Sequence, residues 1–526
     1  MEDFRIENLS FKYPKSDEYA LSDIKLCVKS GEFLLVIGES GSGKTTLLRM
    51  LKNELRPHGE MSGEILFRGN NIASLDERES AKRIGFIMQD PDSQIVSDRV
   101  YSEISFGLEN LGLEKEVIRA RVAEFASYFG LNAEFERSTV TLSGGQKQLL
   151  NLASVMAMEP DVIVLDEPTS QLDPIAAVEF LDALKRLNDD FGVTIIIAEH
   201  HLENIYKYAD RVLCMENGSV RLCDSPREVV RKLEDCKIAY TLPVSARLYR
   251  ELNDKLNPPL TIKEGRELIR KFKNDYYISQ KELKNENIAF SCREVWFRYE
   301  KNSADILKGF SLKVYRGEFY SVVGENGCGK STLLKLLNGS VKQYRGRVKQ
   351  ESAAVAYLPQ NPKNLFVKDT LEDDFKSVDN SYMELCRRFN LQNLLNRHPY
   401  DLSGGELERT ALCKLLLTKP EVLLLDEPTK GLDAFKKQEL GKLLRELSGE
   451  GITIVCVTHD LDFAAEFADR CGLLFDGEIT SENFTNAFFT NNSFYTTSSA
   501  KLSKGVFRNA VTYGDLLECV KAVDRR

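Results

Sequence analysis

Short apolar runs bounded by glycine or polar residues recur along the chain. The longest lie at 162–165 and 193–198, and a comparable run over 32–38 ends on Gly38. Apolar runs of this length are typical of strands that are buried on both faces, as in a parallel sheet. From Lys44, the sequence KTTLLRML favours a helix instead. This succession of buried strand and helix predicts an α/β fold with a parallel-sheet core.

The same hydropathy pattern bears on membrane insertion. No apolar run approaches the roughly 18 residues that a bilayer-spanning helix needs. The first residues, MEDFRIENLS, are acidic and polar, unlike a secretory signal peptide. We therefore expect any membrane role of this chain to depend on another polypeptide.

The chain also repeats itself over a long distance. The first pair of matching segments begins at Gly38 (GESGSGKTTLLRML) and Gly324 (GENGCGKSTLLKLL). The second begins at Leu142 (LSGGQ) and Leu402 (LSGGE), and the third at Val162 and Val422, where an apolar run leads into LDEP. The first pair is 286 residues apart and the other two pairs are 260 apart, so the second copy is shorter by 26 residues upstream of LSGGE. A period this long indicates tandem duplication of one large domain rather than a solenoid of small units.

The repeat sets the expected domain boundaries. The first copy covers about 1–225 and the second about 286–480. Between them, 226–285 is rich in helix formers and charges and is too apolar in places for a flexible linker, so we expect a small helical appendage. The C-terminal tail, 481–526, is rich in Ser, Thr and Asn and closes with an amphipathic segment, 513–523, which predicts a packed helix.

Composition excludes some classes of protein. The 526 residues are enough for three or four domain-sized units at roughly 150 residues each. The formal net charge is −9, which argues against nucleic-acid binding as the main task and leads us to expect no nucleic-acid partner. The 11 cysteines include no C-x-x-C pair, so neither a zinc site nor a disulfide framework is indicated.

The strongest chemical signal is G-x-x-x-x-G-K-[ST], which lies between the predicted strand and helix in both copies. Glycines there let backbone N–H groups turn inward around phosphates, and the helix N-terminus adds positive potential. The lysine reaches the β- and γ-phosphates, and the next hydroxyl binds Mg²⁺. The residues are Gly38, Gly41, Ser42, Gly43, Lys44, Thr45 and Thr46 in the first copy, and Gly324, Gly327, Cys328, Gly329, Lys330, Ser331 and Thr332 in the second.

Two pairs of carboxylates supply the second signal. Asp166 and Glu167, and then Asp426 and Glu427, follow apolar runs that are expected to be strands. An acid at the carboxyl end of a parallel strand beside a phosphate loop can hold Mg²⁺. The glutamate that follows is placed to orient or activate the attacking water.

The phosphate loop, LSGGQ and LDEP in this order resemble the nucleotide-binding domain of ATP-binding cassette (ABC) proteins, over 1–222 and 286–480. The resemblance implies two P-loop NTPase domains in tandem, each with a parallel-sheet core, an antiparallel β part and a helical subdomain, and small helical appendages besides. In that family two such domains pair head to tail, and each ATP lies between the phosphate loop of one domain and the signature motif of the other. ATP and Mg²⁺ are the implied cofactors, and ATP hydrolysis is the implied reaction.

The resemblance also implies a role for individual residues. One ATP site would join the first phosphate loop to the second signature motif, and the other would join the second phosphate loop to the first signature motif. The signature residues are Ser143, Gly144, Gly145 and Gln146 in the first copy and Ser403, Gly404, Gly405 and Glu406 in the second. The catalytic residues would be Glu167 and Glu427 together with the switch histidines His200 and His459, which would contact the γ-phosphate. The residues that would hold Mg²⁺ are Thr45, Gln89, Asp166, Ser331, Gln360 and Asp426. Tyr13 and Tyr299 are similar to the aromatic residues that stack on adenine, and Asp173 and Asp433 to acids that cross the domain interface.

The stretch after Gln89, QDPDSQIVSDRVYSEISFGLENLGL, is similar to the ATPases of energy-coupling factor (ECF) transporters. The matching residues are Gln94, Glu103, Phe106, Gly107, Glu109 and Asn110, with Asp90 in place of the usual Asn. The resemblance implies the motor subunit of an importer of a vitamin, vitamin precursor or metal ion, peripheral to the cytoplasmic face of the membrane. It would bind a coupling transmembrane protein and a substrate-capturing protein through a groove near each of the Q-loop glutamines, which are Gln89 and Gln360.

Two other classes remain open. A soluble tandem ABC ATPase acting on the ribosome would resemble a pattern with a long charged linker, whereas 226–285 is shorter and mixed in charge. The tandem ATPase of another importer class, such as sugar importers, usually has one degraded site, whereas both copies here keep Lys, Asp, Glu and His. The departure in the signature motif, Glu406 where the first copy has Gln146, predicts some asymmetry in hydrolysis.

Overall fold

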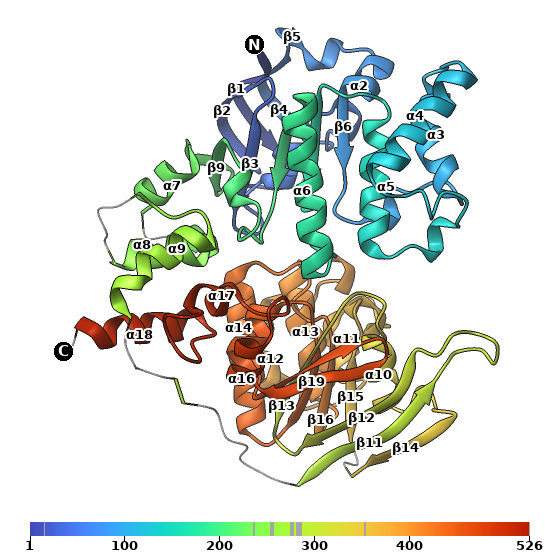
Figure 1. The fold of residues 1–526 in the computed structure, drawn as a ribbon, viewed down its shortest axis with the longest axis vertical. Coiled ribbons are helices and arrows are strands. Elements are labelled where there is room, and N and C mark those ends of the chain that lie inside the picture. The colour runs from blue at the N-terminus through green and yellow to red at the C-terminus, as the bar shows by residue number, and fades with distance from the viewer. Residues whose placement is uncertain are drawn as a thin grey trace. The chain divides into compact units, whose positions relative to one another are not determined.

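The computed structural model describes residues 1–14, 16–234, 237–252, 257–273, 278–279, 287–351 and 354–524 (Figure 1). The chain divides into two compact units, Met1–Gly265 and Arg266–Arg526. The division falls inside one helix, α9, Ile262–Ile269.

Two sheets form the framework of the first unit. One is antiparallel, in the order β2-β1-β4-β5, and the other has six strands, in the order β10-β9-β3-β8-β7-β6. In the six-stranded sheet β9, β3, β8, β7 and β6 run parallel, and β10 closes it as the partner of a hairpin. The strands are β1 (Glu2–Lys12), β2 (Leu21–Lys29), β3 (Phe33–Gly38), β4 (Glu60–Phe67), β5 (Asn70–Asn71), β6 (Ile84–Ile87), β7 (Val162–Asp166), β8 (Thr194–Ala198), β9 (Arg211–Glu216) and β10 (Ser219–Asp224).

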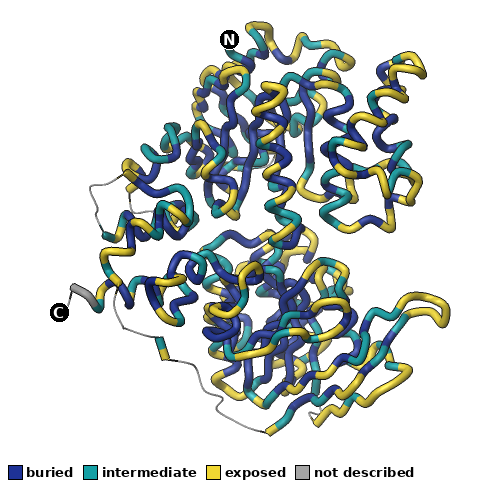
Figure 2. The backbone as a smooth tube through the Cα atoms, viewed as in Figure 1, coloured by how far each residue is buried: buried dark blue, intermediate teal, exposed yellow. Residues whose placement is uncertain are grey.

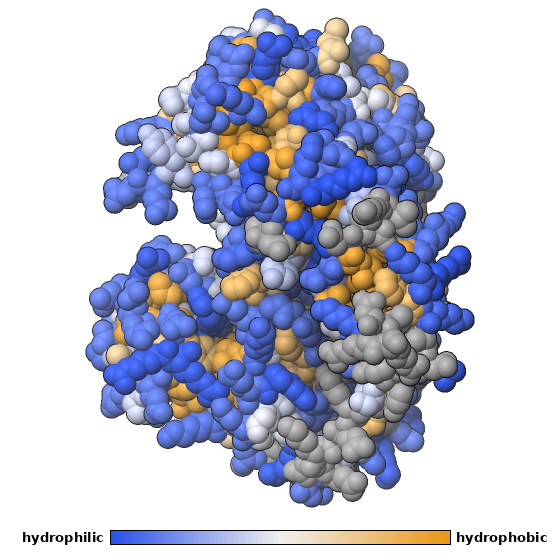
Figure 3. All heavy atoms as spheres, turned by 90° about the vertical axis from the view of Figure 1, so that its left-hand side faces the viewer, coloured by the Kyte–Doolittle hydropathy of each residue, from blue (hydrophilic) through white to orange (hydrophobic). Residues whose placement is uncertain are grey.

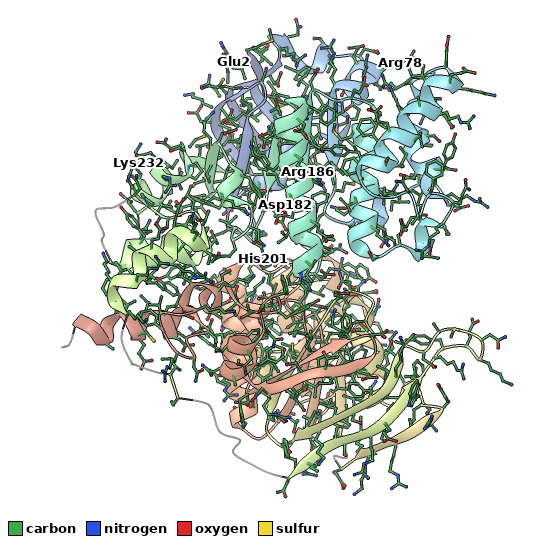
Figure 4. The ribbon with its side chains drawn as sticks, in the orientation of Figure 1. Glu2, Arg78, Asp182, Arg186, His201 and Lys232 are labelled. Atoms are coloured by element: carbon green, nitrogen blue, oxygen red, sulfur yellow. The ribbon has the colours of Figure 1, made fainter. Side chains whose placement is uncertain are left out.

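Helices of the first unit connect these strands and form a helical part between β6 and β7. They are α1 (Lys44–Met50), α2 (Glu77–Arg83), α3 (Val100–Asn110), α4 (Lys115–Tyr128), α5 (Gly144–Met156), α6 (Pro174–Phe191), α7 (Pro226–Lys232) and α8 (Val244–Leu252), and the short 3-10 turns η1 (Asn53–Leu55), η2 (Ile72–Ser74), η3 (Pro91–Ser93), η4 (Thr139–Thr141), η5 (Tyr206–Tyr208) and η6 (Lys237–Thr241). Asp182 and Arg186 project from α6 (Figure 4); Tyr208 donates a hydrogen bond to Asp182, and the Arg186 guanidinium lies 5.8 Å from the centre of the Tyr128 ring. These contacts connect α6 to the turn η5 and to α4 of the helical part.

The second unit repeats this plan. Its antiparallel sheet has the order β12-β11-β14, and its six-stranded sheet has the order β15-β16-β17-β13-β18-β19. The strands are β11 (Ile288–Phe297), β12 (Leu307–Tyr315), β13 (Phe319–Val323), β14 (Arg345–Gln350), β15 (Val355–Leu358), β16 (Val422–Asp426), β17 (Thr453–Val457), β18 (Arg470–Phe475) and β19 (Glu478–Phe484). The helices are α10 (Lys330–Leu337), α11 (Leu371–Lys376), α12 (Met383–Arg388), α13 (Gly404–Leu416), α14 (Ala434–Gly449), α15 (Leu461–Phe467), α16 (Thr485–Asn491), α17 (Ser498–Ser503) and α18 (Tyr513–Asp524), with 3-10 turns η7 (Arg270–Phe272), η8 (Pro362–Leu365), η9 (Gln392–Leu394) and η10 (Pro399–Asp401).

Hydrophobic burial explains the two kinds of sheet. All five residues of β7 are buried, as are those of β16, because helices or the second sheet cover both faces of a parallel strand (Figure 2). In β1, buried positions alternate irregularly with exposed ones, as expected where one face meets the core and the other meets water. In each unit a cluster of buried hydrophobic side chains includes residues of both sheets. It contains Phe4 of β1 and Val36 of β3 in the first unit, and Phe290 of β11 and Val322 of β13 in the second.

The segments outside the two repeats also contain packed structure. In 226–285, α7 is anchored where Tyr206 Oη donates to the Pro226 carbonyl at 3.1 Å, and Arg227 pairs with Glu264 at 3.1 Å. In the tail, Phe488 and Phe489 of α16 are fully buried in the core of the second unit. The predicted helix at 513–523 is observed as α18, whereas the parts of the linker prediction at 235–236, 253–256, 274–277 and 280–285 lie outside the described residues.

The predicted fold class, α/β with two repeats that each combine a largely parallel sheet with an antiparallel one, is confirmed. In the described part of the chain, none of the helices combines the length and the apolar character that a bilayer-spanning segment requires. On the face shown in Figure 3, hydrophilic side chains predominate and apolar areas are interspersed among them.

Candidate nucleotide site in each unit

Each phosphate loop has a backbone that only glycine adopts readily. Gly41 and Gly43 have φ of 85° and 96°, and their counterparts Gly327 and Gly329 have φ of 84° and 104°. A Cβ on Gly43 would also lie 2.6 Å from the Ala20 carbonyl oxygen. These left-handed residues turn the chain from a buried strand into a helix within six residues, a geometry that presents successive N–H groups to an anion.

The lysine that begins each helix folds back over its loop. Lys44 Nζ donates to the carbonyls of Gly38 and Glu39 at 2.8 and 3.0 Å. Lys330 Nζ donates to Gly324 and Glu325 at 2.9 and 2.8 Å. Both ammonium groups are therefore held above the loop, at the position from which a phosphate charge can be neutralised.

A buried hydroxyl in the first loop also points to a ligand. Ser42 is 4 % exposed, and Ser42 Oγ has no hydrogen-bond partner among the described residues. Leaving a buried hydroxyl without a partner is costly, whereas a bound phosphate would supply an acceptor. The loop thus fits a nucleotide phosphate.

The hydroxyl after each lysine reaches the aspartate at the end of the neighbouring strand. Thr45 Oγ1 donates to Asp166 Oδ1 at 3.0 Å, and Ser331 Oγ donates to Asp426 Oδ1 at 3.1 Å. Burial, with Glu167 beside it, raises the pKa of Asp166 to about 6, and burial likewise raises the pKa of Asp426. A hydroxyl and a carboxylate at this spacing are oxygen ligands suited to Mg²⁺, whose charge would favour the ionised aspartate.

Next to each aspartate, a glutamate is held in an unusual backbone conformation. Glu167 and Glu427 have φ of 48° and 53°, a left-handed region that side chains other than glycine rarely adopt. Such strain is found where the surrounding structure imposes a particular side-chain position, often at functional sites. Here it lies directly after β7 and β16 in the equivalent position of both units.

Each of these glutamates pairs with the histidine predicted as a switch residue. In the first unit, His200 Nε2 lies 2.8 Å from Glu167 Oε1, and Gln89 Nε2 donates to Glu167 Oε2 at 3.2 Å. The structure therefore brings together three residues that are more than 30 positions apart in sequence. They form a polar group in which a carboxylate, an imidazole and an amide meet at the ends of adjacent strands.

In the second unit the corresponding contacts differ. His459 Nδ1 lies 2.7 Å from Glu427 Oε2, and Lys330 Nζ lies 4.0 Å from Glu427 Oε1. Burial favours protonation of Glu427, but His459 and Lys330 outweigh it and the pKa of Glu427 is lowered. Gln360 follows β15 and is exposed, so it occupies the position of Gln89 at a strand end.

The two tyrosines predicted to stack on adenine stand beside the phosphate loops. Tyr13 Oη lies 3.0 Å from Thr46 Oγ1, and Tyr299 Oη lies 3.3 Å from Thr332 Oγ1. Tyr13 is 38 % exposed and Tyr299 is 54 % exposed. Each ring is thus fixed at its hydroxyl end while part of its surface remains open to a base.

The signature motifs begin helices, with different hydrogen bonds in the two units. Ser143 Oγ accepts from the Gln146 N–H at 3.2 Å, and Gln146 Oε1 accepts from the Ser143 N–H at 3.0 Å, which is a capping box at the start of α5. In the second unit Glu406 Oε2 accepts from both the N–H and the hydroxyl of Ser403, at 2.8 and 2.7 Å. The hydroxyl proton of Ser403 is therefore directed to the Glu406 carboxylate.

The sequence patterns did not indicate two further residues at these sites. Tyr357, on β15, donates its hydroxyl to Asp426 Oδ2 at 3.1 Å, whereas the first unit has Phe86 in that position. Glu199, directly before His200, is buried beside the loop that follows Glu167. Neither belongs to a motif, and a sequence signal exists only in the difference between the two copies.

Asp173 and Asp433, which the sequence indicated, are N-caps of α6 and α14, where they accept from the N–H groups of Ala176 and Lys436 at 3.0 and 2.9 Å.

Each unit thus combines a phosphate loop, a hydroxyl–aspartate pair and a glutamate–histidine pair on a largely parallel sheet, which defines a P-loop nucleotide-binding domain. The family described as ABC transporter matches residues 21–170 and 307–430. The chain belongs to this family of ATP-binding proteins.

Similar proteins from several organisms extend over nearly the whole chain. A protein of Bacillus thuringiensis subsp. konkukian named as an ABC transporter ATP-binding protein is 41 % identical over 98 % of this chain and 97 % of its own length. Another of that name from Methanosarcina acetivorans is 33 % identical over 93 % of this chain and 86 % of its own. Proteins of this family bind and hydrolyse ATP, so the chain is an ATPase.

A solved structure shares the tandem fold. The archaeal ribosome recycling factor aABCE1, in complex with the ribosomal stalk protein aP1, aligns with a TM-score of 0.61 over 92 % of this chain and 91 % of its own. The two are 21 % identical, so the likeness concerns the fold.

Proposed function

We propose that this chain is the motor subunit of an ECF-type membrane importer, peripheral to the cytoplasmic face of the membrane. It would bind a coupling transmembrane protein and a substrate-capturing protein, and the cargo would be a vitamin, a vitamin precursor or a metal ion. The observation that carries the proposal is a pair of exposed apolar side chains that recurs beside the Q-loop segment of both units. Support also comes from the family relationship and from the ECF-like sequence after Gln89.

Within this proposal ATP binds at two composite sites, each joining one phosphate loop to the signature motif of the other unit. Lys44 and Lys330 neutralise phosphate charge, and the hydroxyl–aspartate pairs hold Mg²⁺ together with the Q-loop glutamines. Glu167 and Glu427 orient the attacking water, and His200 and His459, which pair with these carboxylates, contact the γ-phosphate. ATP binding then draws the two units together, and hydrolysis releases them.

The exposed apolar pair of the first unit is Val96 and Val140, which are 64 % and 79 % exposed. The segments that carry them are joined, because Thr139 Oγ1 donates to the Ser97 carbonyl at 2.8 Å. Glu103 fixes the first of them by accepting from the N–H groups of Val96 and Ser97 at 3.0 and 2.7 Å. Hydrogen bonds therefore hold the segments that carry the two valines, and the exposure of these side chains is a feature of the fold.

The second unit has the equivalent pair in Val367 and Tyr400, which are 82 % and 57 % exposed. Asp374 takes the place of Glu103 and accepts from the Val367 N–H at 3.2 Å. Apolar side chains that remain in water at the same place in both repeats are typical of a contact surface for another protein. We call each of these two pairs the coupling surface of its unit and assign both to the membrane partner.

Charging the coupling surface of the first unit should separate coupling from hydrolysis. Val96→Asp with Val140→Asp should abolish co-purification of the membrane partner, because carboxylates cannot enter an apolar contact without a large desolvation cost. Hydrolysis by the isolated chain should stay within about twofold of its original rate, since surface substitutions are nearly neutral for the fold. The measurement is pull-down from detergent-solubilised membranes alongside phosphate release. Val117→Asp, on the exposed side of α4, is the matched control, and equal losses of binding and hydrolysis would contradict the assignment.

The function itself is tested by purifying the tagged chain from detergent-solubilised native membranes and identifying what accompanies it by mass spectrometry. One or two small and very hydrophobic proteins are expected. Ribosomal proteins without a membrane protein would overturn the proposal in favour of a soluble tandem ATPase. The coupling-surface variant serves as the negative control in the same experiment.

The two composite sites should also differ in ATP affinity. Burial alone would raise the pKa of Glu406, but hydrogen bonds from Ser403 lower it, so a carboxylate charge stands at the signature motif of the second unit. Replacing Glu406 by Gln removes that charge and should lower the KM for ATP about fivefold, the size of one screened charge interaction. The reverse change, Gln146→Glu, should raise it by a similar factor. Unaltered KM values in both variants would contradict a role of these residues beside the γ-phosphate.

A further inference from the structure

A carboxylate is buried behind the glutamate–histidine pair of the first unit. Glu199 lies between the end of β8 and His200, and it is 2 % exposed. Burial raises the pKa of Glu199 to about 7, and three hydrogen bonds to its oxygens act in the opposite direction. Burying an ionisable group costs folding free energy unless the group is well hydrogen-bonded. The role of Glu199 is therefore best judged from the three groups that donate to it.

Two of the hydrogen bonds come from the turn that follows the proposed catalytic glutamate. Glu199 Oε1 accepts from the Thr169 N–H at 3.0 Å and from Thr169 Oγ1 at 2.7 Å. Thr169 stands two residues after Glu167, whose backbone has the strained φ of 48°. The carboxylate thus anchors the turn on which Glu167 is carried.

The third hydrogen bond comes from the histidine itself. Glu199 Oε2 accepts from the His200 backbone N–H at 3.3 Å. With the backbone N–H of His200 directed to Glu199, the His200 ring meets Glu167 through Nε2, at 2.8 Å from Oε1. The other carboxylate oxygen of Glu167 accepts from Gln89 Nε2 at 3.2 Å.

The second unit shows the arrangement without this carboxylate. Thr458 occupies the position of Glu199, and its hydroxyl lies 3.4 Å from that of Thr429. The backbone N–H of His459 now donates to the catalytic glutamate, at 3.2 Å from Glu427 Oε2. The ring approaches the same oxygen through Nδ1, at 2.7 Å. One oxygen of Glu427 therefore takes both contacts from His459.

From this comparison we infer that Glu199 is a positioning residue for ATP hydrolysis in the first unit. By accepting the His200 N–H in place of Glu167 and by anchoring Thr169, it leaves the two oxygens of Glu167 to separate partners, the imidazole and Gln89. Thr458 cannot do this, so the two units hold their catalytic glutamates differently. The inference rests on the proposed roles of Glu167 and His200.

The geometry predicts what happens when Glu199 is replaced by Thr, as in the second unit. The His200 N–H must then turn to Glu167, as the His459 N–H turns to Glu427, and Glu167 loses its position against Gln89. Hydrolysis at this site should slow about tenfold, in line with the sensitivity of catalysis to small displacements. ATP affinity should not change, because Glu199 touches neither the phosphate loop nor the Thr45–Asp166 pair.

The experiment uses the full chain with Glu427→Gln, so that only the site with Glu167 hydrolyses. Excess chain is mixed with Mg–ATP, and conversion of bound ATP to ADP is followed in a single turnover, with ATP affinity titrated in parallel. Glu199→Gln is the decisive variant: it is isosteric and can keep both contacts with Thr169, but its amide nitrogen cannot accept the His200 N–H. We expect Glu199→Gln and Glu199→Thr to slow the turnover about tenfold with unchanged ATP affinity, and the Gln variant to keep its thermal stability.

Two outcomes would overturn the inference. Turnover of both Glu199 variants within about twofold of the parent would show that the carboxylate does not position Glu167, as would a slowing matched by an equal loss of ATP affinity or of stability. Glu167→Gln in the same background separates this from failure of the proposed site. If that variant is inactive while the Glu199 variants are fast, only the inference is wrong; if it remains active, the role of Glu167 and the inference built on it both fall.

Discussion

Replacing Glu167 and Glu427 together by glutamine should abolish steady-state ATP hydrolysis, by about a thousandfold, while ATP still binds. Both glutamates follow a buried strand with a left-handed backbone, and each pairs with a histidine at 2.8 or 2.7 Å. Glutamine keeps the shape of the side chain but cannot take a proton from the attacking water. The phosphate loops remain intact, so bound ATP should hold the paired units closed. Phosphate release and the ATP retained after desalting measure both effects.

Glu179→Gln, an isosteric change on the exposed side of α6, provides the control for this double variant and should leave hydrolysis unchanged. Each single variant reports on one site, and the two should differ in rate if the different contacts of Glu167 and Glu427 matter. Steady turnover by the double variant would remove both glutamates from the hydrolytic step.

The second large effect is expected from Lys44→Ala, which should weaken ATP binding at the first phosphate loop about a hundredfold, the scale of losing a charge-assisted hydrogen bond from a buried group. Lys44 is 5 % exposed and is held against the carbonyls of Gly38 and Glu39, so its charge is already positioned over the loop. Alanine leaves the β- and γ-phosphates without a counter-charge there. Titration with a fluorescent ATP analogue should show the stoichiometry fall from two sites to one.

Lys330→Ala should have the same effect on the other loop, and the two changes together should eliminate tight binding. Lys25→Ala is the control, because Lys25 pairs with Asp23 on the exposed side of β2 and lies in neither loop. Two tight sites in the Lys44→Ala chain would show that this lysine does not hold nucleotide.

Local sequence was sufficient for the elements that frame each site. The apolar runs at 162–165 and 193–198 became β7 and β8, because strands buried on both faces need uninterrupted apolar side chains. The glycines of the phosphate loop were predictive for a similar reason, since the left-handed residues Gly41 and Gly43 leave little choice of amino acid. Membership of the ABC family and the α/β fold class, both predicted from the sequence, are confirmed.

Segments outside the motifs were harder to predict. The tail is rich in Ser, Thr and Asn, yet α16 and α17 are ordered there and Phe488 and Phe489 are fully buried in the second core. Composition averages over such a segment, while burial depends on a few apolar side chains that meet a complementary surface. The tail is therefore part of the second unit, where Thr496 and Thr497 donate their hydroxyls to the backbone of Phe489 and Val511.

The sequence by itself determined the duplication, the α/β fold, the ABC family and the residue types of each site, because these depend on local conformation and on chemistry that tolerates few substitutes. Only the tertiary structure decided how the proposed catalytic glutamates and the aspartates beside them are held. Glu199 and Thr169 are 30 residues apart, and Tyr357 and Asp426 are 69 apart. Such partners meet because parallel strands bring distant segments to one edge of a sheet, and hydrogen-bonding there depends on distances of a few tenths of an ångström that no local pattern encodes.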